Sequence, residues 1–207
     1  MTPIELLQQR ANQRSAEFIE QNGQSALIFT KFRKLWSYAA SELPDKGLMI
    51  ECGVWRGRSI NFFAQKFPKR TLYGFDSFEG LCESWSGSAL QKGSFNLDGV
   101  LPKVEDNVVL TKGWVEDTLP PFFASNKNKI AYLHVDTDTY LPAKTILSLA
   151  KSRLQKGAIV LFDELIGYPN WELGEYKALT EEIPRDAYEY IAFADRQSAI
   201  RIIKPIK

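Results

Sequence analysis

The chain has 207 residues, of which 44% are hydrophobic and 25% charged, a composition typical of one globular domain. Its 26 lysines and arginines nearly balance 25 aspartates and glutamates, so no basic footprint favours nucleic acid or an anionic membrane as the main partner. No apolar run approaches the roughly 20 residues that cross a bilayer and the N-terminus lacks the apolar core of a secretory signal, so we expect a cytoplasmic protein.

The N-terminal part of the chain has a helical pattern. Apolar residues recur at helical spacing over residues 3–21 and 25–42, and the segment LPDKG then breaks the pattern. We therefore expect a helical N-terminal extension over residues 1–45 and one domain over residues 46–207.

Short apolar runs alternate with helical segments through the rest of the chain. The expected strands are, in chain order, GLMIEC, TLYGFD, NVVLTKG, IAYLHVD, GAIVLFDE, AYEYIAF and SAIRIIKPI, and the expected helices lie at about residues 59–67, 141–154 and 171–182. This alternation predicts an α/β fold with a mostly parallel seven-stranded sheet and helices on both faces. The last two runs, separated by ADRQ, predict a C-terminal antiparallel hairpin.

The first two strand ends carry residues suited to a nucleoside. Ligands of open parallel sheets bind beyond the carboxyl ends of the strands, where ECGVWRGRS places Glu51, Gly53 and Ser59 and the next strand places Asp76. An acid at the second strand end suits ribose hydroxyls, although a turn or helix-capping role is the alternative. The turn reads G-x-x-x-G, not the G-x-G-x-x-G of pyrophosphate-binding folds, and it can also be a simple tight connection. Together these features indicate a nucleoside ligand without a diphosphate.

Five segments give the sequence a more specific resemblance. ECGVWRGRS, YGFDSFEGL, TKGWVEDTLP, LHVDTDTY and GAIVLFDE, in this order, resemble the macrocin O-methyltransferase family over about residues 48–166. The resemblance implies a Rossmann-like class I methyltransferase fold, S-adenosylmethionine as donor, a divalent cation that is usually Mg²⁺, and methyl transfer to a hydroxyl of a sugar or related small polar molecule. The donor-binding positions that it implies are Glu51, Gly53, Ser59, Asp76, Ser77, Gly113, Trp114 and Asp136.

Acidic residues end the fourth and fifth strands. Asp136 ends the fourth, and Asp163 with Glu164 ends the fifth. Carboxylates gathered at neighbouring strand ends raise one another's pKa values, and a hard divalent ion removes this conflict. We therefore predict that these three residues bind the metal; a set of solvated loop acids is the alternative.

The base that removes the hydroxyl proton has two candidates on the chain. We predict Asp138 as the base, beside Asp136 as the second catalytic residue, with a helix cap as the alternative role for Asp138. The single histidine, His134, lies inside the fourth strand. An imidazole can serve as a base, but strand alternation favours a hydrogen-bonded core position for His134.

Two other functions fit the predicted fold. One is a non-catalytic nucleoside-binding or scaffold protein, which would have little need of the acids at positions 136, 138, 163 and 164. The other is a nicotinamide-dependent oxidoreductase, which the missing diphosphate loop disfavours. For the preferred function we expect a small, sugar-like acceptor, a lid and acceptor wall formed by residues 77–100 and the segment IGYPNWELGEY, and, from the resemblance, homo-oligomers.

Overall fold

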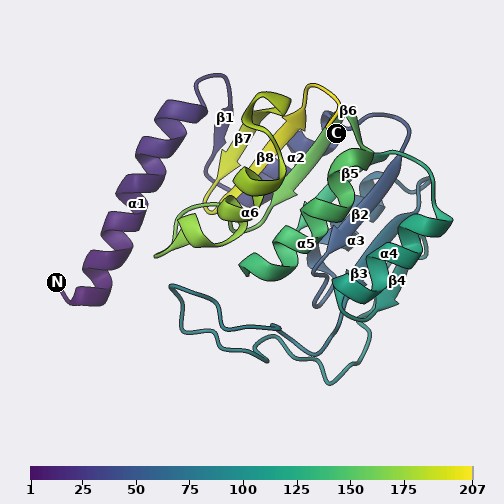
Figure 1. Cartoon of the computed structure of the whole chain (residues 1–207), viewed down its shortest axis with the longest axis horizontal. Helices are drawn as coiled ribbons and strands as arrows, with labels where there is room; N and C mark the ends of the chain where they lie inside the picture. The colour runs from purple at the N-terminus through teal and green to yellow at the C-terminus, as the bar shows by residue number, and fades with distance from the viewer. Residues whose placement is uncertain (207) are drawn as a thin grey trace.

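An eight-stranded sheet lies at the centre of the computed structural model, which describes residues 1–206 (Figure 1). The strand order is β1-β7-β8-β6-β5-β2-β3-β4. The strands are β1 Leu27–Phe29, β2 Leu48–Cys52, β3 Leu72–Asp76, β4 Val108–Lys112, β5 Ile130–Val135, β6 Leu154–Phe162, β7 Tyr188–Ala194 and β8 Gln197–Ile202.

The sheet is mostly parallel, and its strand order reverses beside β2. From β2 the chain passes outward through β3 to β4, then returns to the other side of β2 with β5 and continues to β6. The β2–β5 boundary is therefore the switch point where open α/β sheets bind ligands. Strand β8 is antiparallel to both β6 and β7, which confirms the predicted C-terminal hairpin.

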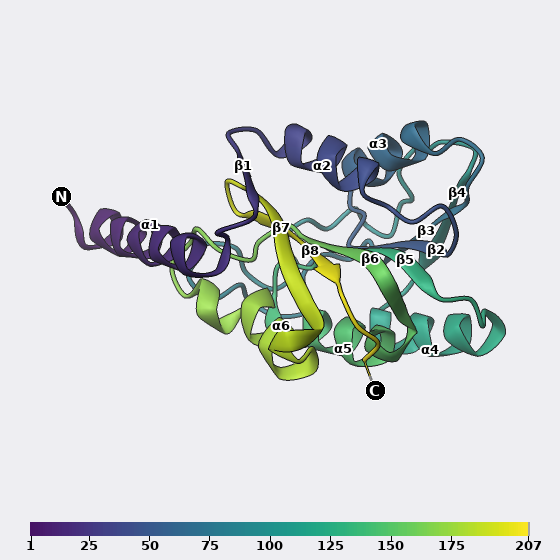
Figure 2. The same cartoon turned by 90° about the horizontal axis from the view of Figure 1, so that it is seen from above.

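Helices cover both faces of the sheet, as predicted. Figure 2 shows α2 and α3 on one face and α4, α5 and α6 on the other. The helices are α1 Pro3–Asn22, α2 Phe32–Ser41, α3 Arg58–Lys66, α4 Val115–Ser125, α5 Tyr140–Ala150 and α6 Glu175–Glu182. Every residue of β5 is buried, because parallel strands inside the sheet pack against helices on both sides.

The N-terminal region differs from the prediction. Residues 25–42 do not form one helix: Leu27–Phe29 pairs in parallel with β7 as the edge strand β1, and α2 begins only at Phe32. Pairing with a strand near the other end of the chain decides this conformation, and helical spacing alone cannot reveal it. The sheet described here thus has eight strands instead of seven, and residues 1–45 are not wholly helical. The domain boundary at residue 45 stays a prediction.

The segment 77–107 has no helix or strand and runs along the ends of the strands (Figure 1). It is fastened to the 165–174 region, where Trp85 packs edge to face on Tyr168 with ring centroids 5.4 Å apart. Gly87 approaches so closely that a Cβ there would lie 1.6 Å from the carbonyl oxygen of Pro169. The two segments predicted as lid and acceptor wall are therefore in contact. None of the helices in the described residues is long and apolar enough to cross a membrane.

Candidate active site

The turn after β2 brings two strand ends unusually close together. Gly53 has φ +88°, and a Cβ at this position would lie 1.6 Å from the carbonyl oxygen of Asp136. Only glycine avoids this clash and adopts this φ without strain. The close approach sets the end of β5, with its acidic residues, directly beside the turn.

Asp76 anchors the same turn through its carboxylate. Its Oδ2 accepts hydrogen bonds from the amides of Val54 and Trp55, both at 2.7 Å, and Oδ1 accepts one from the amide of Phe78 at 2.7 Å. A carboxylate has about four accepting positions, so room remains for about one further donor. The alternative role as a turn aspartate is thus present in the structure. Contact between Asp76 and a ribose stays a prediction.

Glu51 lies beneath the site instead of on its wall. Its side chain is 1% exposed, Oε1 accepts a hydrogen bond from Ser59 Oγ at 2.8 Å, and Oε2 lies 3.0 Å from His134 Nδ1. The reason is register: Glu51 and His134 are directly paired across β2 and β5, so their side chains emerge on the same face. Glu51 is not among the described residues that line the cavity, whereas its hydrogen-bond partner Ser59 is. The role of Glu51 in binding the donor stays a prediction.

His134 has the hydrogen-bonded core position that alternation favoured. The ring is fully buried between Glu51 and Asp163, whose Oδ1 lies 3.7 Å from His134 Nε2. Burial alone would lower the pKa of His134, but the two neighbouring carboxylates raise it well above its ordinary range. These two carboxylates therefore favour the protonated form of the ring.

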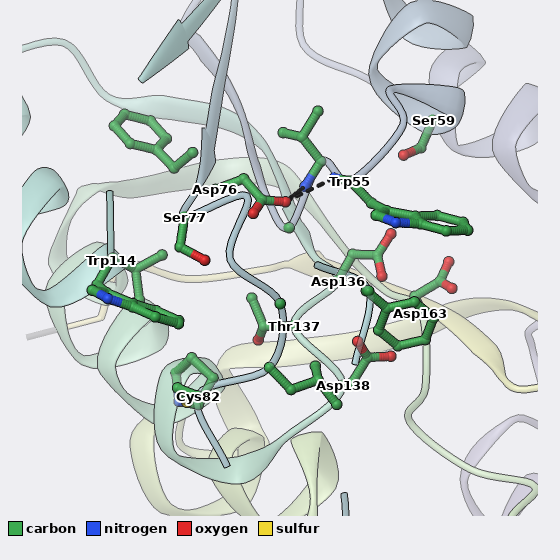
Figure 3. A pocket seen from close by; sticks show the side chains of 18 of the residues that line it. Trp55, Ser59, Asp76, Ser77, Cys82, Trp114, Asp136, Thr137, Asp138 and Asp163 are labelled. Atoms are coloured by element: carbon green, nitrogen blue, oxygen red, sulfur yellow. Dashed lines mark hydrogen bonds between the residues drawn. The ribbon is translucent and has the colours of Figure 1, made fainter. Parts of the chain in front are cut away.

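Four carboxylates gather at one end of a single cavity of about 250 Å³. Figure 3 shows Asp136, Asp138 and Asp163 pointing into a common space, and Glu164 lines the same cavity. Their possible ligand atoms form two groups within 4.8 Å: Asp136 with Asp138 and Glu164, and Asp136 with Asp163 and His134. The predicted set of Asp136, Asp163 and Glu164 is therefore divided, with Asp136 shared between the groups and Asp138 beside Glu164.

The carboxylates differ in their protonation. Burial, followed by the negative charge of Asp163, raises the pKa values of Asp136 and Glu164 well above their ordinary range. Burial alone would also raise the pKa of Asp163, but His134 outweighs this effect and holds it below its ordinary value. For Asp138, burial and the charge of Asp163 raise the pKa to about 7. Without a cation, burial and mutual repulsion thus favour the protonated forms of Asp136 and Glu164, and His134 favours the ionised form of Asp163.

The acidic cluster fits a divalent cation. Glu164 Oε2 is buried and has no hydrogen-bond partner among residues 1–206, so a ligand for this oxygen would remove the cost of leaving it unpaired. Carboxylate oxygens are the ligands that Mg²⁺ prefers, and a double positive charge would relieve their mutual repulsion. Behind the cluster, Glu175 Oε2 accepts a hydrogen bond from the amide of Glu164 at 3.1 Å and holds that part of the chain in place.

Asp138 does not cap a helix. The N-cap residue of α5 is Thr139, and this helix end has no side-chain cap hydrogen bond. Asp138 itself has φ +61°, an uncommon conformation for a residue other than glycine. Such strain concentrates at functional sites, where the surrounding structure maintains it. Asp138 therefore does not have the alternative role of a helix cap.

The other predicted donor-binding residues lie together around the same cavity. Gly53, Ser59, Asp76, Ser77, Gly113, Trp114 and Asp136 all line it. In Figure 3 Trp114 lies beyond Ser77, on the side away from the acids. Phe95, Leu81 and Cys82 also line the cavity but were not singled out from the sequence, because they belong to the irregular 77–107 segment and only tertiary contacts bring them here.

Comparison with known proteins identifies the family to which the chain belongs. A family model described as a methyltransferase domain matches residues 50–165, more than half of the chain. The chain belongs to this methyltransferase family. The motif resemblance and the predicted methyltransferase fold are thereby confirmed.

The chain has curated relatives that are named as O-methyltransferases. It is 29% identical over 140 residues to the 8-demethyl-8-(2,3-dimethoxy-alpha-L-rhamnosyl)-tetracenomycin-C 4'-O-methyltransferase of Streptomyces olivaceus, covering 57% of this chain and 52% of the relative. Identity to the mycinamicin III 3''-O-methyltransferase of Micromonospora griseorubida is 27% over 144 residues, covering 57% and 55%. The alignments thus span about half the length of the curated relatives.

Solved structures agree with the fold of the chain. The calicheamicin methyltransferase CalS11 superposes with a TM-score of 0.68 and 27% identity, over 81% of this chain and 77% of that one. The O-methyltransferase NovP superposes with a TM-score of 0.58 and 20% identity, over 83% and 79%, which supports the fold alone.

Proposed function

We propose that this protein transfers a methyl group from S-adenosylmethionine to a hydroxyl of a sugar or related small polar molecule, assisted by Mg²⁺ or another divalent cation. The observation that carries the proposal is the juxtaposition, in one cavity of a methyltransferase-family chain, of a glycine turn and four acids. Both curated relatives are named as O-methyltransferases, and the rhamnosyl group in the name of the first supports the acceptor class.

The donor has a suitable place along the turn and the ends of β3 and β4. Gly53 and Ser59 would lie along its methionine and ribose part, Asp76 and Ser77 near the ribose, and Trp114 beside the adenine. The amides of Val54 and Trp55 are not free to bind a diphosphate, because both already donate hydrogen bonds to Asp76. This arrangement favours a donor without phosphates over a nicotinamide dinucleotide.

A divalent cation would be held by Asp136, Asp163 and Glu164, with Asp138 beside them as the proton acceptor. When bound, it would supply positive charge that lowers the pKa of an acceptor hydroxyl and orients its oxygen. The protein's own contribution is to keep these acids buried and close together, which makes their interaction with any positive charge stronger than in water.

Asp138 is the residue best suited to take the hydroxyl proton. It lines the cavity, and a pKa of about 7 leaves it partly ionised and able to accept a proton near neutral pH. His134 is fully buried beneath the site and paired with Glu51, so it is less suited to this role. The methyl carbon would then bond to the acceptor oxygen as its bond to sulfur breaks, and no protein nucleophile is required.

The acceptor wall would include Trp55. Its side chain is 41% exposed while it lines the cavity, its ring contacts Phe95 edge to face at 5.3 Å, and the guanidinium of Arg56 lies 4.7 Å from its ring centre. Figure 3 places the ring beside Asp136 and Asp163. An exposed aromatic face next to the acids suits the apolar face of a sugar ring, and the segment 77–107 would close over it.

Calorimetric titration of the purified protein tests the proposal. We expect S-adenosylmethionine and S-adenosylhomocysteine to bind and NAD not to bind; binding of NAD alone would defeat the assignment. Transfer of a labelled methyl group to rhamnose-containing acceptors should then need Mg²⁺ and stop with EDTA. Transfer that continues unchanged in EDTA would remove the cation from the proposal. Location in the cytoplasm, homo-oligomerisation and the absence of a nucleic-acid partner remain predictions.

A further inference from the structure

A buried glutamine lies directly behind the acidic cluster. Gln197 is the first residue of β8 and only 5% exposed. Its Nε2 donates a hydrogen bond to Asp163 Oδ1, and its Oε1 accepts one from Trp36 Nε1 at 2.9 Å. Trp36 belongs to α2 and is fully buried. The active-site acid is thereby connected to a helix on the face of the sheet.

The partner on α2 determines which way the amide points. An indole N–H can only donate a hydrogen bond, so it must face the carbonyl end of the Gln197 side chain. The amino end is then directed to Asp163, which as a carboxylate can only accept. Trp36 thus keeps the glutamine in the one orientation that benefits the acid.

These contacts occupy one oxygen of Asp163 and leave the other available. Oδ1 receives the Gln197 hydrogen bond and lies 3.7 Å from His134 Nε2. Within residues 1–206, no hydrogen bond to Oδ2 is present, and Asp163 lines the cavity. On its other side His134 is paired with Glu51, which also binds Ser59. Polar side chains therefore lie next to one another from β8, past the end of β6, through β5 and β2 to the first turn of α3, and the widest separation is the 3.7 Å between Asp163 and His134.

We propose that Gln197, oriented by Trp36, is a positioning residue that fixes the rotamer of Asp163 so that Oδ2 faces the cation site. The proposal rests on the cation-assisted function described above. Hydrogen-bond partners that orient a metal ligand contribute about 10- to 100-fold to metal affinity. Gln197 touches neither donor nor acceptor, so its effect is expected on cation affinity and not on donor affinity.

Binding of Mn²⁺ to the full chain, followed by electron paramagnetic resonance without donor or acceptor, tests this inference. Gln197→Met keeps the length of the side chain but removes the amide, and it should raise the Kd of Mn²⁺ about 10- to 100-fold. Trp36→Phe removes the N–H that orients the amide and should raise the Kd several-fold. The matched control is Ser198→Ala: Ser198 is the next residue of β8 and fully buried, and its hydroxyl has no partner in the described part of the chain. This control should bind Mn²⁺ within about two-fold of wild type.

The affinity for S-adenosylhomocysteine separates positioning from general damage. A structural defect weakens both ligands, whereas positioning weakens Mn²⁺ alone. Folded Gln197→Met protein with wild-type Mn²⁺ affinity would overturn the inference; if this variant does not fold, the same result in Trp36→Phe overturns it. Failure of the wild type to bind S-adenosylhomocysteine would instead refute the donor assignment, and failure to bind Mn²⁺ would remove both the cation and the role of Gln197.

Discussion

Replacement of Gly53 by alanine tests whether the close approach of β2 and β5 assembles the site. The new Cβ would lie 1.6 Å from the carbonyl oxygen of Asp136 and 2.5 Å from its carbonyl carbon. Ordinary carbon–oxygen contacts begin at roughly 3.3 Å, so the strand ends must separate by more than 1 Å. Both groups are backbone, and no side-chain rotation can relieve the clash.

The expected cost has two parts that a control can separate. A φ of +88° costs alanine about 1–2 kcal/mol, and overpacking adds about 1–3 kcal/mol, for a total of about 2–5 kcal/mol. Gly157 has a similar φ of +84°, but the nearest atom to its Cβ would be Pro44 Cγ at 3.7 Å, an ordinary contact. Gly157→Ala therefore carries the conformational cost alone. In a domain of this size each kcal/mol lowers Tm by about 2–4 °C.

Thermal unfolding and calorimetry check the comparison. Gly53→Ala should lower Tm by about 4–20 °C and weaken binding of S-adenosylhomocysteine and Mn²⁺ at least 10-fold, because the Asp136 backbone moves. Gly157→Ala should lower Tm by about 2–8 °C and leave both affinities within two-fold. Equal ligand affinities in the two variants would show that the approach of the two strand ends does not build the site.

Three further outcomes are expected. Asp138→Asn should slow single-turnover methyl transfer about 10²-fold or more with S-adenosylhomocysteine affinity retained, and a normal rate would exclude Asp138 as the base. The fold raises the pKa of Asp138 from 3.8 to about 7, so its stabilising contribution is complete below about pH 4 and is lost as the pH rises through about 7. The Tm of the protein in EDTA should therefore fall between about pH 4 and 7, less steeply in Asp138→Asn; a rising Tm would contradict this. Trp55→Leu should raise the KM for a rhamnoside acceptor about 10-fold, with Trp55→Phe intermediate and donor affinity unchanged, and equal KM values in all three would remove Trp55 from the acceptor wall.

The N-terminal strand illustrates where sequence reasoning fails. The apolar spacing of residues 25–42 is helical, yet Leu27–Phe29 is a strand because β7 provides a pairing edge. Three residues carry too little local pattern to compete with the helical spacing around them. By contrast, the wholly buried β5 was predicted from its apolar run, which only His134 interrupts, since a central parallel strand is buried on both faces.

The amino-acid sequence by itself determined the strands β2 to β8, the helices α3, α5 and α6, the glycine turn and the acids that follow β5 and β6, because each depends on residues that are neighbours along the chain. Only the tertiary structure decided that Glu51 points beneath the cavity, that Asp138 joins Glu164, and that Gln197 and Trp36 support Asp163. These relations depend on register between paired strands and on packing of α2 against the sheet. Such contacts join residues far apart in the sequence, and no local pattern records them.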